Sequence, residues 1–432
     1  MKQKAVVIGL GYVGFPLACA IVKSRKYNVV GIEIDKQKLD LIDQRISPIE
    51  DHQAQEDIKA ITLKATDDFS EIKGASFIII CVPTPVSHEK EPDLTPLLNA
   101  ARQVSNHLTR GQTVIIESTI NPGVCEEDVL PILEQSGLIG GIDFELVHCP
   151  ERIDPANTSW NVYNIPRNIG GITRQGTKQA ANFYRSFLKG EITELSCLKS
   201  AEATKIVENT FRDINIAYVN ELAKSFDYLG IDILEVIKGA STKPFAYMAH
   251  YPGCGVGGHC IPVDPYYLIA KAKKAGFDHT FLKTARKINN SMNRYTVEKL
   301  IVGLNELGKS VKHTKIGILG ISYKANIGDL RESPSLEIIK ILNKYEPDLL
   351  LCDPYVKNGH VKELQALIAG SHLVDMETVL TQSEAIMVLT SHDEFLQIKD
   401  WSQVQLIVDG RNCLDKEEIK KQGIIYKGIG RT

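Results

Sequence analysis

A glycine-rich turn near the amino terminus constrains the fold of this chain more than any other sequence feature. Gly9, Gly11 and Gly14 form a G-x-G-x-x-G motif between an apolar run over 4–9, which predicts a strand, and a helical pattern over 14–26. In such a turn the first glycine permits the tight bend, the second lets a pyrophosphate approach the backbone, and the third allows close helix packing. Because the amino end of a helix binds phosphates, the motif predicts a dinucleotide-binding βαβ unit.

An acidic residue at the end of the next predicted strand indicates which cofactor binds. Glu33 lies in the strand predicted over 28–34, 19 residues beyond Gly14. A carboxylate there accepts hydrogen bonds from the ribose hydroxyls and repels a 2′-phosphate. The predicted cofactor is therefore NAD, not NADP, and Lys38 nearby weakens this preference without reversing it. A glycine-rich turn that holds no ligand is the alternative.

The alternation of strand and helix patterns predicts an α/β fold with two Rossmann-like doubly wound domains joined by a long central helix. We expect an NAD-binding domain over 1–198, a central helical region over 199–311, and a second α/β domain over 312–432. The central region begins with one helix over about 199–232, which connects the domains or lines the interface of a dimer or larger homo-oligomer. The other elements predicted before 312 are strands over 76–82, 113–118 and 144–148 and helical stretches over 94–108, 123–136 and 266–307.

Composition and charge exclude several classes of function. The 50 Lys and Arg residues against 53 Asp and Glu give a net charge of −3, so we expect no nucleic-acid partner. The nine cysteines include no C-x-x-C pair, which favours reduced, cytoplasmic thiols over disulfides or a zinc site. Glycines and Pro16 interrupt the uncharged run over 5–22, so we expect no signal peptide, membrane span or membrane partner.

Polar residues at two further strand ends extend the predicted cofactor site. Pro83 and Thr84 follow the strand over 76–82, and Thr119 follows the strand over 113–118. Ligands bind at this edge of open α/β sheets, so these residues are candidate contacts. Plain turn residues are the alternative.

The segment YPGCGVGGHCIPVDP, residues 251–265, predicts a nucleophile. Four glycines within 253–258 let the backbone pass close to a ligand, and Cys260 can then attack that ligand. An inert buried thiol is the alternative, and Cys254 is interpreted in that way. His259 suggests a metal site, but adjacent residues of an extended segment point apart and no second ligand cluster exists, so no metal is predicted.

A polar stripe is predicted on the long helix. Lys205, Asn209 and Arg212 are spaced at i, i+4 and i+7, opposite an apolar arc, which suits an anionic or hydroxyl-rich ligand. A solvated helix face is the alternative. Asn209 favours the functional interpretation, because with Lys205 it could polarise an alcohol oxygen during oxidation.

Eight motifs occur in a characteristic order, namely GLGYVGFPLA, CVPTP, ESTINPG, CPERIDP, AEATKIVENTFRDINIAYVNEL, YPGCGVGGHCIPVDPYYL, GISYKANIGDLRESPS and VDGRN. Over essentially the whole chain they resemble the UDP-glucose/GDP-mannose dehydrogenase family. The resemblance implies that the C6 alcohol of a UDP-sugar is oxidised twice with two NAD⁺. The segments KPFAYMAHYPG and ERIDPAN…NIPRNIGG favour UDP-N-acetylglucosamine, with UDP-N-acetylmannosamine, UDP-N-acetylgalactosamine and UDP-glucose as alternatives.

The resemblance also implies roles for individual residues. Cys260 would attack the intermediate aldehyde to give a thiohemiacetal, which is oxidised to a thioester and hydrolysed. The other catalytic positions implied are Lys205 and Asn209 for the oxyanion, Asp264 to assist Lys205 or a water, and Thr119 and Glu151 for water positioning and acid–base chemistry. The cofactor positions are Gly9, Gly11, Tyr12, Val13, Gly14, Glu33, Lys38, Pro83, Thr84, Thr119 and Arg331, of which Arg331 matches a cofactor or a substrate contact. The substrate positions are Arg152, Ile153, Lys205, Asn209, Arg212, Gly257, Tyr323, Lys324 and Arg411.

Two other classes of function remain open on sequence grounds. A two-electron β-hydroxyacid or sugar-phosphate dehydrogenase could use the same cofactor turn and a Lys/Asn helix, but it would not need Cys260. An NAD-responsive binding module would bind NAD without a second, UDP-selective site.

Overall fold

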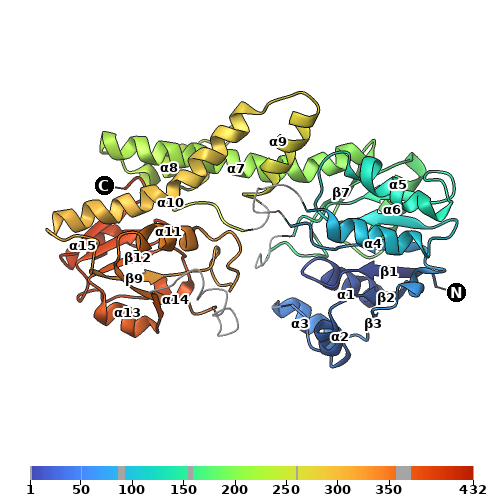
Figure 1. The fold of residues 1–432 in the computed structure, drawn as a ribbon, viewed down its shortest axis with the longest axis horizontal. Coiled ribbons are helices and arrows are strands. Elements are labelled where there is room, and N and C mark those ends of the chain that lie inside the picture. The colour runs from blue at the N-terminus through green and yellow to red at the C-terminus, as the bar shows by residue number, and fades with distance from the viewer. Residues whose placement is uncertain are drawn as a thin grey trace. The chain divides into compact units, whose positions relative to one another are not determined.

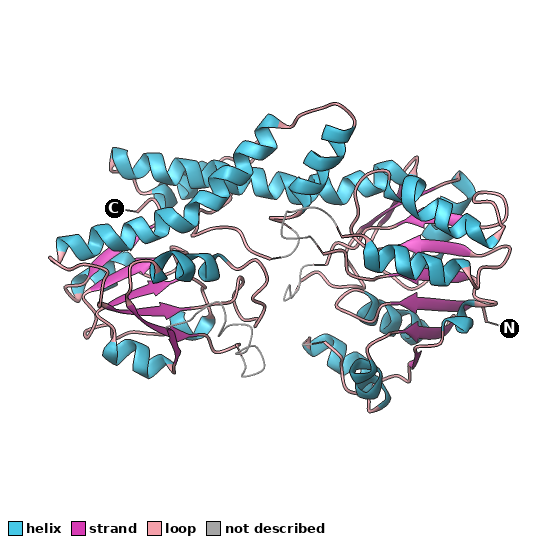
Figure 2. Cartoon of the chain, in the orientation of Figure 1, coloured by secondary structure: helices cyan, strands magenta, loops and turns pink. Residues whose placement is uncertain are grey.

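The computed structural model describes residues 2–49, 51–85, 93–153, 159–258, 261–356 and 371–431 (Figure 1). The chain divides into two compact units, one formed by Met1–Glu208 with Tyr266–Phe277 and the other by Asn209–Pro265 with Asp278–Thr432. Each unit contains its own mainly parallel sheet with helices packed on it (Figure 2). The predicted α/β class with two doubly wound domains and a long central helix is therefore confirmed.

The first unit is built on an eight-stranded sheet in the order β3-β2-β1-β4-β5-β6-β7-β8. Its strands are β1 Lys4–Ile8, β2 Asn28–Ile32, β3 Lys64–Thr66, β4 Phe77–Ile80, β5 Thr113–Ile116, β6 Glu145–His148, β7 Arg167–Gly171 and β8 Ile192–Glu194. All neighbours are parallel except β6 and β7, which are antiparallel. No helix occurs among the described residues between β6 and β7, and a parallel pair would need such a crossover.

Both faces of this sheet are covered. Along β1, Ala5 and Val7 pack in one apolar cluster with Phe15, whereas Val6 and Ile8 pack in a second cluster with other helices. Alternate side chains of a strand point to opposite faces, so a continuous apolar run predicts a strand buried on both sides. The helices of this unit are α1 Gly14–Ser24, α2 Lys36–Asp43, α3 His52–Lys59, α4 Thr95–Ser105, α5 Leu130–Leu133, α6 Arg174–Arg185 and α9 Asp264–Lys274, whose first two residues belong to the second unit.

The second unit contains a six-stranded, fully parallel sheet in the order β11-β10-β9-β12-β13-β14. Its strands are β9 Lys315–Leu319, β10 Asp348–Cys352, β11 Ser371–Leu373, β12 Ala385–Val388, β13 Leu406–Asp409 and β14 Ile425–Gly428. Its helices are α8 Ile233–Ala240, α10 Thr280–Glu306, α11 Pro334–Asn343, α13 Met376–Gln382, α14 Asp393–Leu396 and α15 Lys416–Lys421.

The predicted long helix is α7, Leu198–Leu229, which passes from the first unit into the second. The single helical stretch predicted over 266–307 is instead two helices, α9 and α10, because Gly276 adopts a left-handed φ of +91° after α9. The helix predicted over 123–136 is also broken, into a π-helical turn Cys125–Val129, α5, and a 3₁₀ turn Glu134–Ser136. Pro131 lies at the start of α5 and has no amide to donate.

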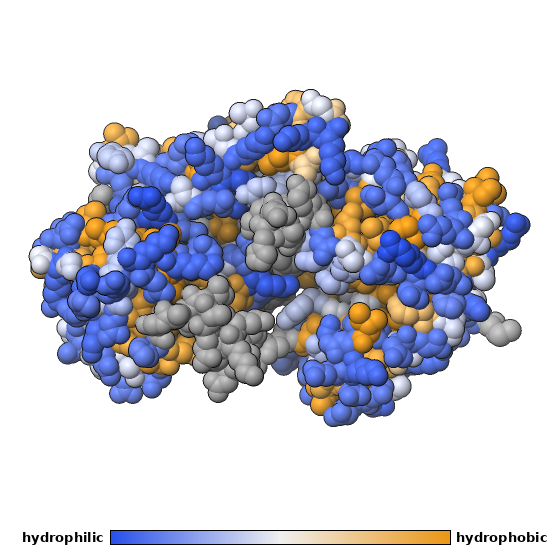
Figure 3. All heavy atoms as spheres, viewed as in Figure 1, coloured by the Kyte–Doolittle hydropathy of each residue, from blue (hydrophilic) through white to orange (hydrophobic). Residues whose placement is uncertain are grey.

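Among the described residues, no helix combines the length and apolar character needed to cross a membrane. On the face shown in Figure 3, hydrophilic residues are interspersed with smaller apolar areas over both units.

Candidate active site

The glycine turn after β1 has the geometry of a phosphate-binding loop. Gly9 has a φ of +88°, and a Cβ on Gly14 would lie 2.0 Å from the carbonyl oxygen of Gly9. A Cβ on Gly11, in contrast, would meet no atom within 4 Å. Gly9 and Gly14 are thus required by the fold, whereas Gly11 borders open space. The N-cap residue of α1 is Val13, which makes no side-chain hydrogen bond to the first amides of the helix. These features fit the pyrophosphate of NAD.

Glu33 is held at the end of β2 beside this turn. It is 7% exposed, and its Oε2 accepts a hydrogen bond from the amide of Leu10 at 2.9 Å. Its Oε1 accepts from the amides of Ile34 and Asp35 at 2.9 and 3.1 Å. Lys38 Nζ lies 3.7 Å from Oε2, so the lysine considered from the sequence does reach this carboxylate. Tyr12, in the turn, is 49% exposed.

The ends of β4 and β5 are tied together. Thr84 donates its hydroxyl to the carbonyl of Thr119 at 2.7 Å, and Ser118 donates to the carbonyl of Val82 at 2.7 Å. Tyr267, on α9, donates to the carbonyl of Thr84 at 2.8 Å. Pro83 is exposed in the same turn. The two strand ends that the sequence suggested separately therefore form one connected edge.

Glu151, Arg152 and Ile153 follow β6 at this edge. Glu151 is 8% exposed, and its carboxylate accepts from the amide of Ile153. Arg152 forms a two-point ion pair with Glu208 of α7, with Nη2 at 2.7 Å and Nε at 3.1 Å, and donates to the carbonyl of Pro166 at 2.9 Å. The guanidinium of Arg152 therefore already has protein partners.

A buried charge network supports this edge, and sequence reasoning missed it. Glu117, directly after β5, accepts hydrogen bonds from Arg167 Nη1 at 2.9 Å and from the hydroxyl of Tyr184. Both charged residues are 1% exposed. Burial raises the pKa of Glu117, and the charge of Arg167 opposes that rise. Arg167 Nη1 also lies 3.9 Å from the sulfur of Cys149, whose pKa burial raises to about 12. The signal available in the sequence was an acid, Glu117, directly after one apolar strand and a base, Arg167, at the start of another strand.

The polar stripe on α7 is only partly accessible. Lys205 is 9% exposed, Asn209 is half-buried and Arg212 is exposed. Asn209 donates from Nδ2 to the carboxylate of Asp264, which is 2% exposed, at 2.5 Å. Glu202, one turn before Lys205, was also missed by the sequence analysis. It accepts from the amides of Gly123 and Cys125 and so ties α7 to the segment after Thr119.

The glycine-rich segment is described over residues 251–258 and 261–265, and His259 and Cys260 lie outside the described residues. Its backbone is fixed by amide hydrogen bonds from Gly253 to Asn220 Oδ1 at 3.0 Å, from Cys254 to the carbonyl of Gly410 at 2.8 Å, and from Gly258 to the carbonyl of Arg331 at 3.2 Å. Cys254 itself is fully buried, and burial raises the pKa of its thiol. This burial agrees with the interpretation of Cys254 as an inert buried thiol.

Gly257 and Gly258 are required because the segment lies directly on Tyr323. A Cβ on Gly257 would be 2.6 Å from Tyr323 Cβ and 2.7 Å from Pro334, and a Cβ on Gly258 would be 2.8 Å from the tyrosine ring. Only glycine allows this close approach.

Arg411, directly after β13 and Gly410, reaches the same segment. Its Nε donates to the carbonyl of Leu389 at 2.8 Å, and its Nη1 donates to the carbonyl of Gly255 at 3.3 Å. Its Nη2 is buried, and no described residue accepts a hydrogen bond from it. A buried guanidinium nitrogen without an acceptor is costly, which suits a ligand oxygen at this point. Gly257, Tyr323 and Arg411 are therefore brought together within the second unit.

Lys324 is half-buried beside Tyr323 in the loop after β9. Arg331, farther along that loop, is exposed, and the carboxylate of Asp329 binds its side chain with Nη2 at 2.6 Å. Arg331 thus contributes its carbonyl to the glycine-rich segment and its guanidinium to an ion pair.

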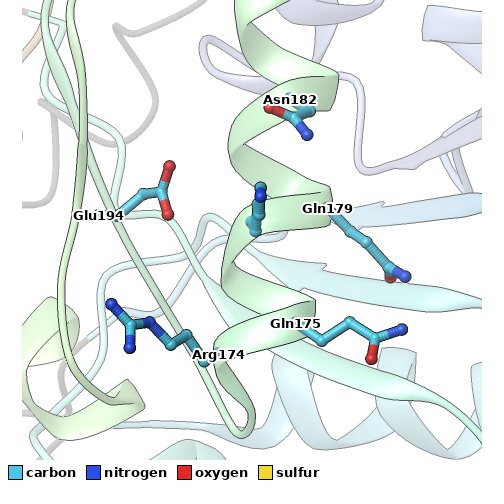
Figure 4. A pocket seen from close by; sticks show the side chains of 6 residues that line it. Arg174, Gln175, Gln179, Asn182 and Glu194 are labelled. Carbon is cyan, nitrogen blue, oxygen red and sulfur yellow. The ribbon is translucent and has the colours of Figure 1, made fainter.

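A hollow elsewhere on the first unit is lined by Arg174, Gln175, Lys178, Gln179, Asn182 and Glu194 (Figure 4). These side chains come from α6 and β8, and they spread to different sides of the helix instead of converging. None of them is a candidate site residue. Within the described ranges, no group of three or more His, Cys, Asp or Glu side chains is arranged to bind a metal ion.

Models of one protein family match three consecutive parts of the chain. The NAD binding domain of the UDP-glucose/GDP-mannose dehydrogenase family matches residues 3–188, its central domain 199–291 and its UDP binding domain 317–416.

Individual proteins match over nearly the whole length. The chain is 35% identical over 439 residues to the UDP-N-acetyl-D-mannosamine dehydrogenase of Pyrococcus horikoshii, with 99% of both chains covered. A solved structure of the UDP-D-ManNAc dehydrogenase from that organism matches with a TM-score of 0.90 over 99% of both chains. The UDP-N-acetyl-D-glucosamine 6-dehydrogenase of Salmonella typhi is 36% identical over 398 residues, which cover 92% of each chain. The chain therefore belongs to the UDP-glucose/GDP-mannose dehydrogenase family of NAD-dependent oxidoreductases.

Proposed function

We propose that this enzyme oxidises the C6 hydroxyl of a UDP-N-acetylhexosamine to the carboxylic acid, with UDP-N-acetylglucosamine as the favoured substrate. One observation carries the proposal. The glycine-rich segment that leads to Cys260 is fixed on Tyr323 and Arg411 of the unit that carries the UDP-binding domain. A nucleotide diphosphate bound by that unit would lie beside the segment, and the thiol follows two residues after Gly258.

The chain's own residues supply the other groups that the reaction needs. NAD⁺ supplies the hydride acceptor, and two equivalents of it with one water carry the alcohol to the carboxylate. Lys205 and Asn209, one turn apart on α7, stabilise the alkoxide and the later oxyanion. Asp264 orients the amide of Asn209 through their hydrogen bond.

Cys260 makes the second oxidation accessible. Its thiolate adds to the aldehyde carbon and forms a C–S bond, and the resulting thiohemiacetal loses a hydride to become a thioester. Water, positioned by Thr119 and Glu151, attacks the thioester carbon, the C–S bond breaks, and the thiolate returns. The low exposure of Glu151 supports this role, because a carboxyl that is shielded from bulk solvent can exchange a proton with a single bound water.

The proposed substrate contacts fall into two groups. Arg411, Tyr323, Lys324 and Gly257 lie in the second unit and serve the UDP moiety, and the buried Nη2 of Arg411 is the donor best placed for a phosphate oxygen. The remaining proposed contacts are Arg152, Ile153, Lys205, Asn209 and Arg212, with Arg331 for either cofactor or substrate. Because Glu208 already binds Arg152, we assign to that arginine a contact through its backbone or through a rearranged ion pair.

The identity of the sugar rests on the relatives and on sequence. Similar proteins are named for N-acetylmannosamine, N-acetylglucosamine and N-acetylgalactosaminuronic acid, which all carry an acetamide. Competition of UDP-GlcNAc, UDP-ManNAc, UDP-GalNAc and UDP-glucose in one preparation tests the assignment. We expect the highest kcat/KM for UDP-GlcNAc, and faster oxidation of UDP-glucose than of all three acetamido sugars would contradict the proposal.

We further propose a cytoplasmic homodimer, or a larger assembly, organised through α7. Phe211 and Tyr218 on α7 are 48% and 58% exposed, and Met248 and Tyr251 of the adjoining segment are 65% and 60% exposed. A second copy is the occupant that the long helix suggests, because apolar side chains of this size characterise the core of stable interfaces. The eight cysteines within the described part of the chain are all free, which suits a reducing compartment. Light scattering of Phe211→Glu tests the interface, since the variant should dissociate. We also propose that the chain is divided into an NAD-binding domain over 1–198, a central helical region over 199–311 and a UDP-sugar-binding domain over 312–432.

A further inference from the structure

Three side chains from different strand ends form a buried cluster in the second unit. Ser322 follows β9, Asp353 follows β10 and His392 follows β12, and these three strands are neighbours in the sheet. Ser322 and His392 are fully buried and Asp353 is 7% exposed. The cluster thus lies at the carboxyl edge of the sheet, where β9 separates β10 from β12.

Asp353 is the acceptor at the centre of the cluster. Its Oδ2 accepts from the amides of Ile321 and Ser322 at 2.8 Å each, from the hydroxyl of Ser322 at 3.0 Å and from His392 Nε2 at 3.1 Å. Burial alone would raise the pKa of Asp353, but the bonds from His392 and the two amides outweigh it and hold the pKa below its usual value. The carboxylate is therefore ionised and can only accept.

These partners determine the state of the His392 ring. Its Nδ1 accepts from the amide of Asn326 at 2.9 Å, and an amide N–H can only donate. The proton of the neutral ring consequently resides on Nε2, which donates it to Asp353. One ring thus joins the end of β10 to residue 326 of the loop after β9, and Tyr355 stacks on it at a ring-centroid distance of 5.0 Å.

The arrangement is not that of a hydrolytic triad. In a triad the serine and the aspartate bind opposite nitrogens of the histidine, so that a proton can pass between them. Here Ser322 Oγ and Asp353 Oδ2 both lie 3.1 Å from the same nitrogen, Nε2. The serine is also fully buried, so no substrate can reach it.

The cluster instead fixes the loop that carries the proposed UDP contacts. Asn326 has a left-handed φ of +63°, and besides its bond to His392 it exchanges two hydrogen bonds with Asp393, at 2.9 and 3.1 Å. At the start of the loop, Ser322 Oγ lies 3.3 Å from the carbonyl of Lys324. Tyr323 and Lys324 are therefore held between two anchored points, Ser322 and Asn326.

The same loop supports the glycine-rich segment. Tyr323 donates its amide to the carbonyl of Asp329 at 3.0 Å, which closes the loop on itself, and the carbonyl of Arg331 accepts from the amide of Gly258. A shift of the loop would accordingly move both the nucleotide contacts and the backbone that leads to Cys260.

We infer that His392 is a positioning residue for the UDP-sugar site, which it serves by holding the amide of Asn326 and so setting the position of Tyr323 and Lys324. The inference rests on the proposed function of that loop. His392 does not touch the substrate. Its effect on binding passes through the hydrogen bond that its Nδ1 accepts from the amide of Asn326.

Two substitutions separate the two bonds of the ring. In His392→Asn, the side-chain oxygen replaces Nδ1 and can still accept from Asn326, whereas the donor to Asp353 is lost. In His392→Gln, the side-chain nitrogen replaces Nε2 and can still donate to Asp353, whereas the acceptor for Asn326 is lost. Both variants lose the stacking on Tyr355, so weaker UDP binding by His392→Gln than by His392→Asn reports the loop bond. Thr314→Val is the matched control, because it removes a buried hydroxyl bonded to the carbonyl of Ser310 at the amino end of β9.

The experiment is calorimetric titration of each full-length variant with UDP, together with KM for the UDP-sugar and for NAD and the melting temperature. His392→Gln should weaken UDP binding and raise KM for the UDP-sugar by about five-fold, the value of one net hydrogen bond, with KM for NAD unchanged. His392→Asn should stay within about two-fold of wild type, although both variants melt at lower temperature. Thr314→Val should lower the melting temperature alone.

Equal UDP affinity for His392→Asn and His392→Gln, with lower melting temperatures for both, would show a purely structural role and overturn the inference. Should neither variant fold, hydrogen exchange of the wild-type protein tests the same bond. The amide of Asn326 should be protected in the free protein and better protected with UDP bound, and an unprotected amide, or one that UDP does not affect, would equally overturn the inference. Because the readout is UDP binding, absence of sugar oxidation by the wild type would count against the proposed reaction and leave this inference standing.

Discussion

Asn209 of α7 donates its side-chain amide to the carboxylate of Asp264, the first residue of α9, across 2.5 Å. Asp264 lies near the end of the glycine-rich segment, four residues after Cys260 in sequence, so the bond links the helix of the polar stripe to the chain beyond Cys260. Only the nitrogen of an amide can donate, so the bond fixes the rotation of the Asn209 side chain.

Replacing Asp264 by Asn should lower kcat by roughly ten-fold, because a hydrogen bond to a charged acceptor becomes a weaker neutral one and Asn209 loses its fixed orientation. Steady-state kinetics should show this loss with little change in UDP affinity. Asp415→Asn, which removes a carboxylate that caps the remote helix α15, is the control and should retain full activity. An unchanged kcat for Asp264→Asn would contradict the role given to the pair.

Gly257→Ala should abolish UDP-sugar oxidation, since the added Cβ would lie 2.6 Å from Tyr323 Cβ and 2.9 Å from the carbonyl oxygen of Glu332. Displacing the segment costs about 1–3 kcal/mol of overpacking and moves the thiol away from the sugar. The matched control is Gly239→Ala in α8, where a Cβ meets nothing within 4 Å. Activity assays and thermal melts should separate the two, and an active Gly257→Ala enzyme would refute the tight packing of Gly257 against Tyr323.

Gly11→Ala should weaken NAD binding, whereas Gly14→Ala should lower the stability of the protein. The first adds a methyl group in open space, so the melting temperature of the free protein should be preserved while NAD binding weakens by at least ten-fold. The second places a Cβ 2.0 Å from the carbonyl oxygen of Gly9 and should lower the stability itself. Melting temperatures with and without NAD, and NAD titrations, distinguish these outcomes. Unimpaired NAD binding by Gly11→Ala would place the pyrophosphate elsewhere.

Glu33→Ala should shift the cofactor preference. Removing the carboxylate abolishes both the contact to the ribose and the repulsion of a 2′-phosphate, and it leaves Lys38 free to attract that phosphate. The ratio of kcat/KM for NAD to that for NADP should fall by about ten-fold or more. Lys38→Ala in the intact background is the control and should raise the ratio. A ratio that is the same in Glu33→Ala and wild type would show that Glu33 only stabilises the turn, through the hydrogen bond that it accepts from the amide of Leu10.

Local sequence signals predicted the elements and much of the proposed site. The glycine turn, the acid after β2 and the strand-end threonines depend on residues within one βαβ unit or at one sheet edge, and such patterns can be read from the sequence alone. The glycine-rich segment was recognisable for the same reason, although its partners Tyr323 and Arg411 were suggested only by resemblance.

Contacts between distant segments could not be predicted in this way. The pairing of Glu117 with Arg167 joins residues 50 positions apart, and nothing near either residue specifies the other. The antiparallel pairing of β6 with β7 depends on the direction in which the chain returns to the sheet, and short-range periodicity does not encode that direction. The apolar arc expected on the long helix opposite the polar stripe includes Ile206 and Val207, and in α7 it is uneven, because Ile206 is 1% exposed whereas Val207 is 57% exposed. Burial of these neighbours depends on tertiary packing, not on helical spacing.

The most direct test of the four-electron reaction is the amount of NADH formed per UDP-GlcNAc consumed to completion, measured by absorbance with the sugar limiting. The proposal predicts a ratio of two, with Cys260→Ser unable to reach it. A ratio near one for the wild type, or a ratio of two that survives in Cys260→Ser, would contradict the central role of the thiol.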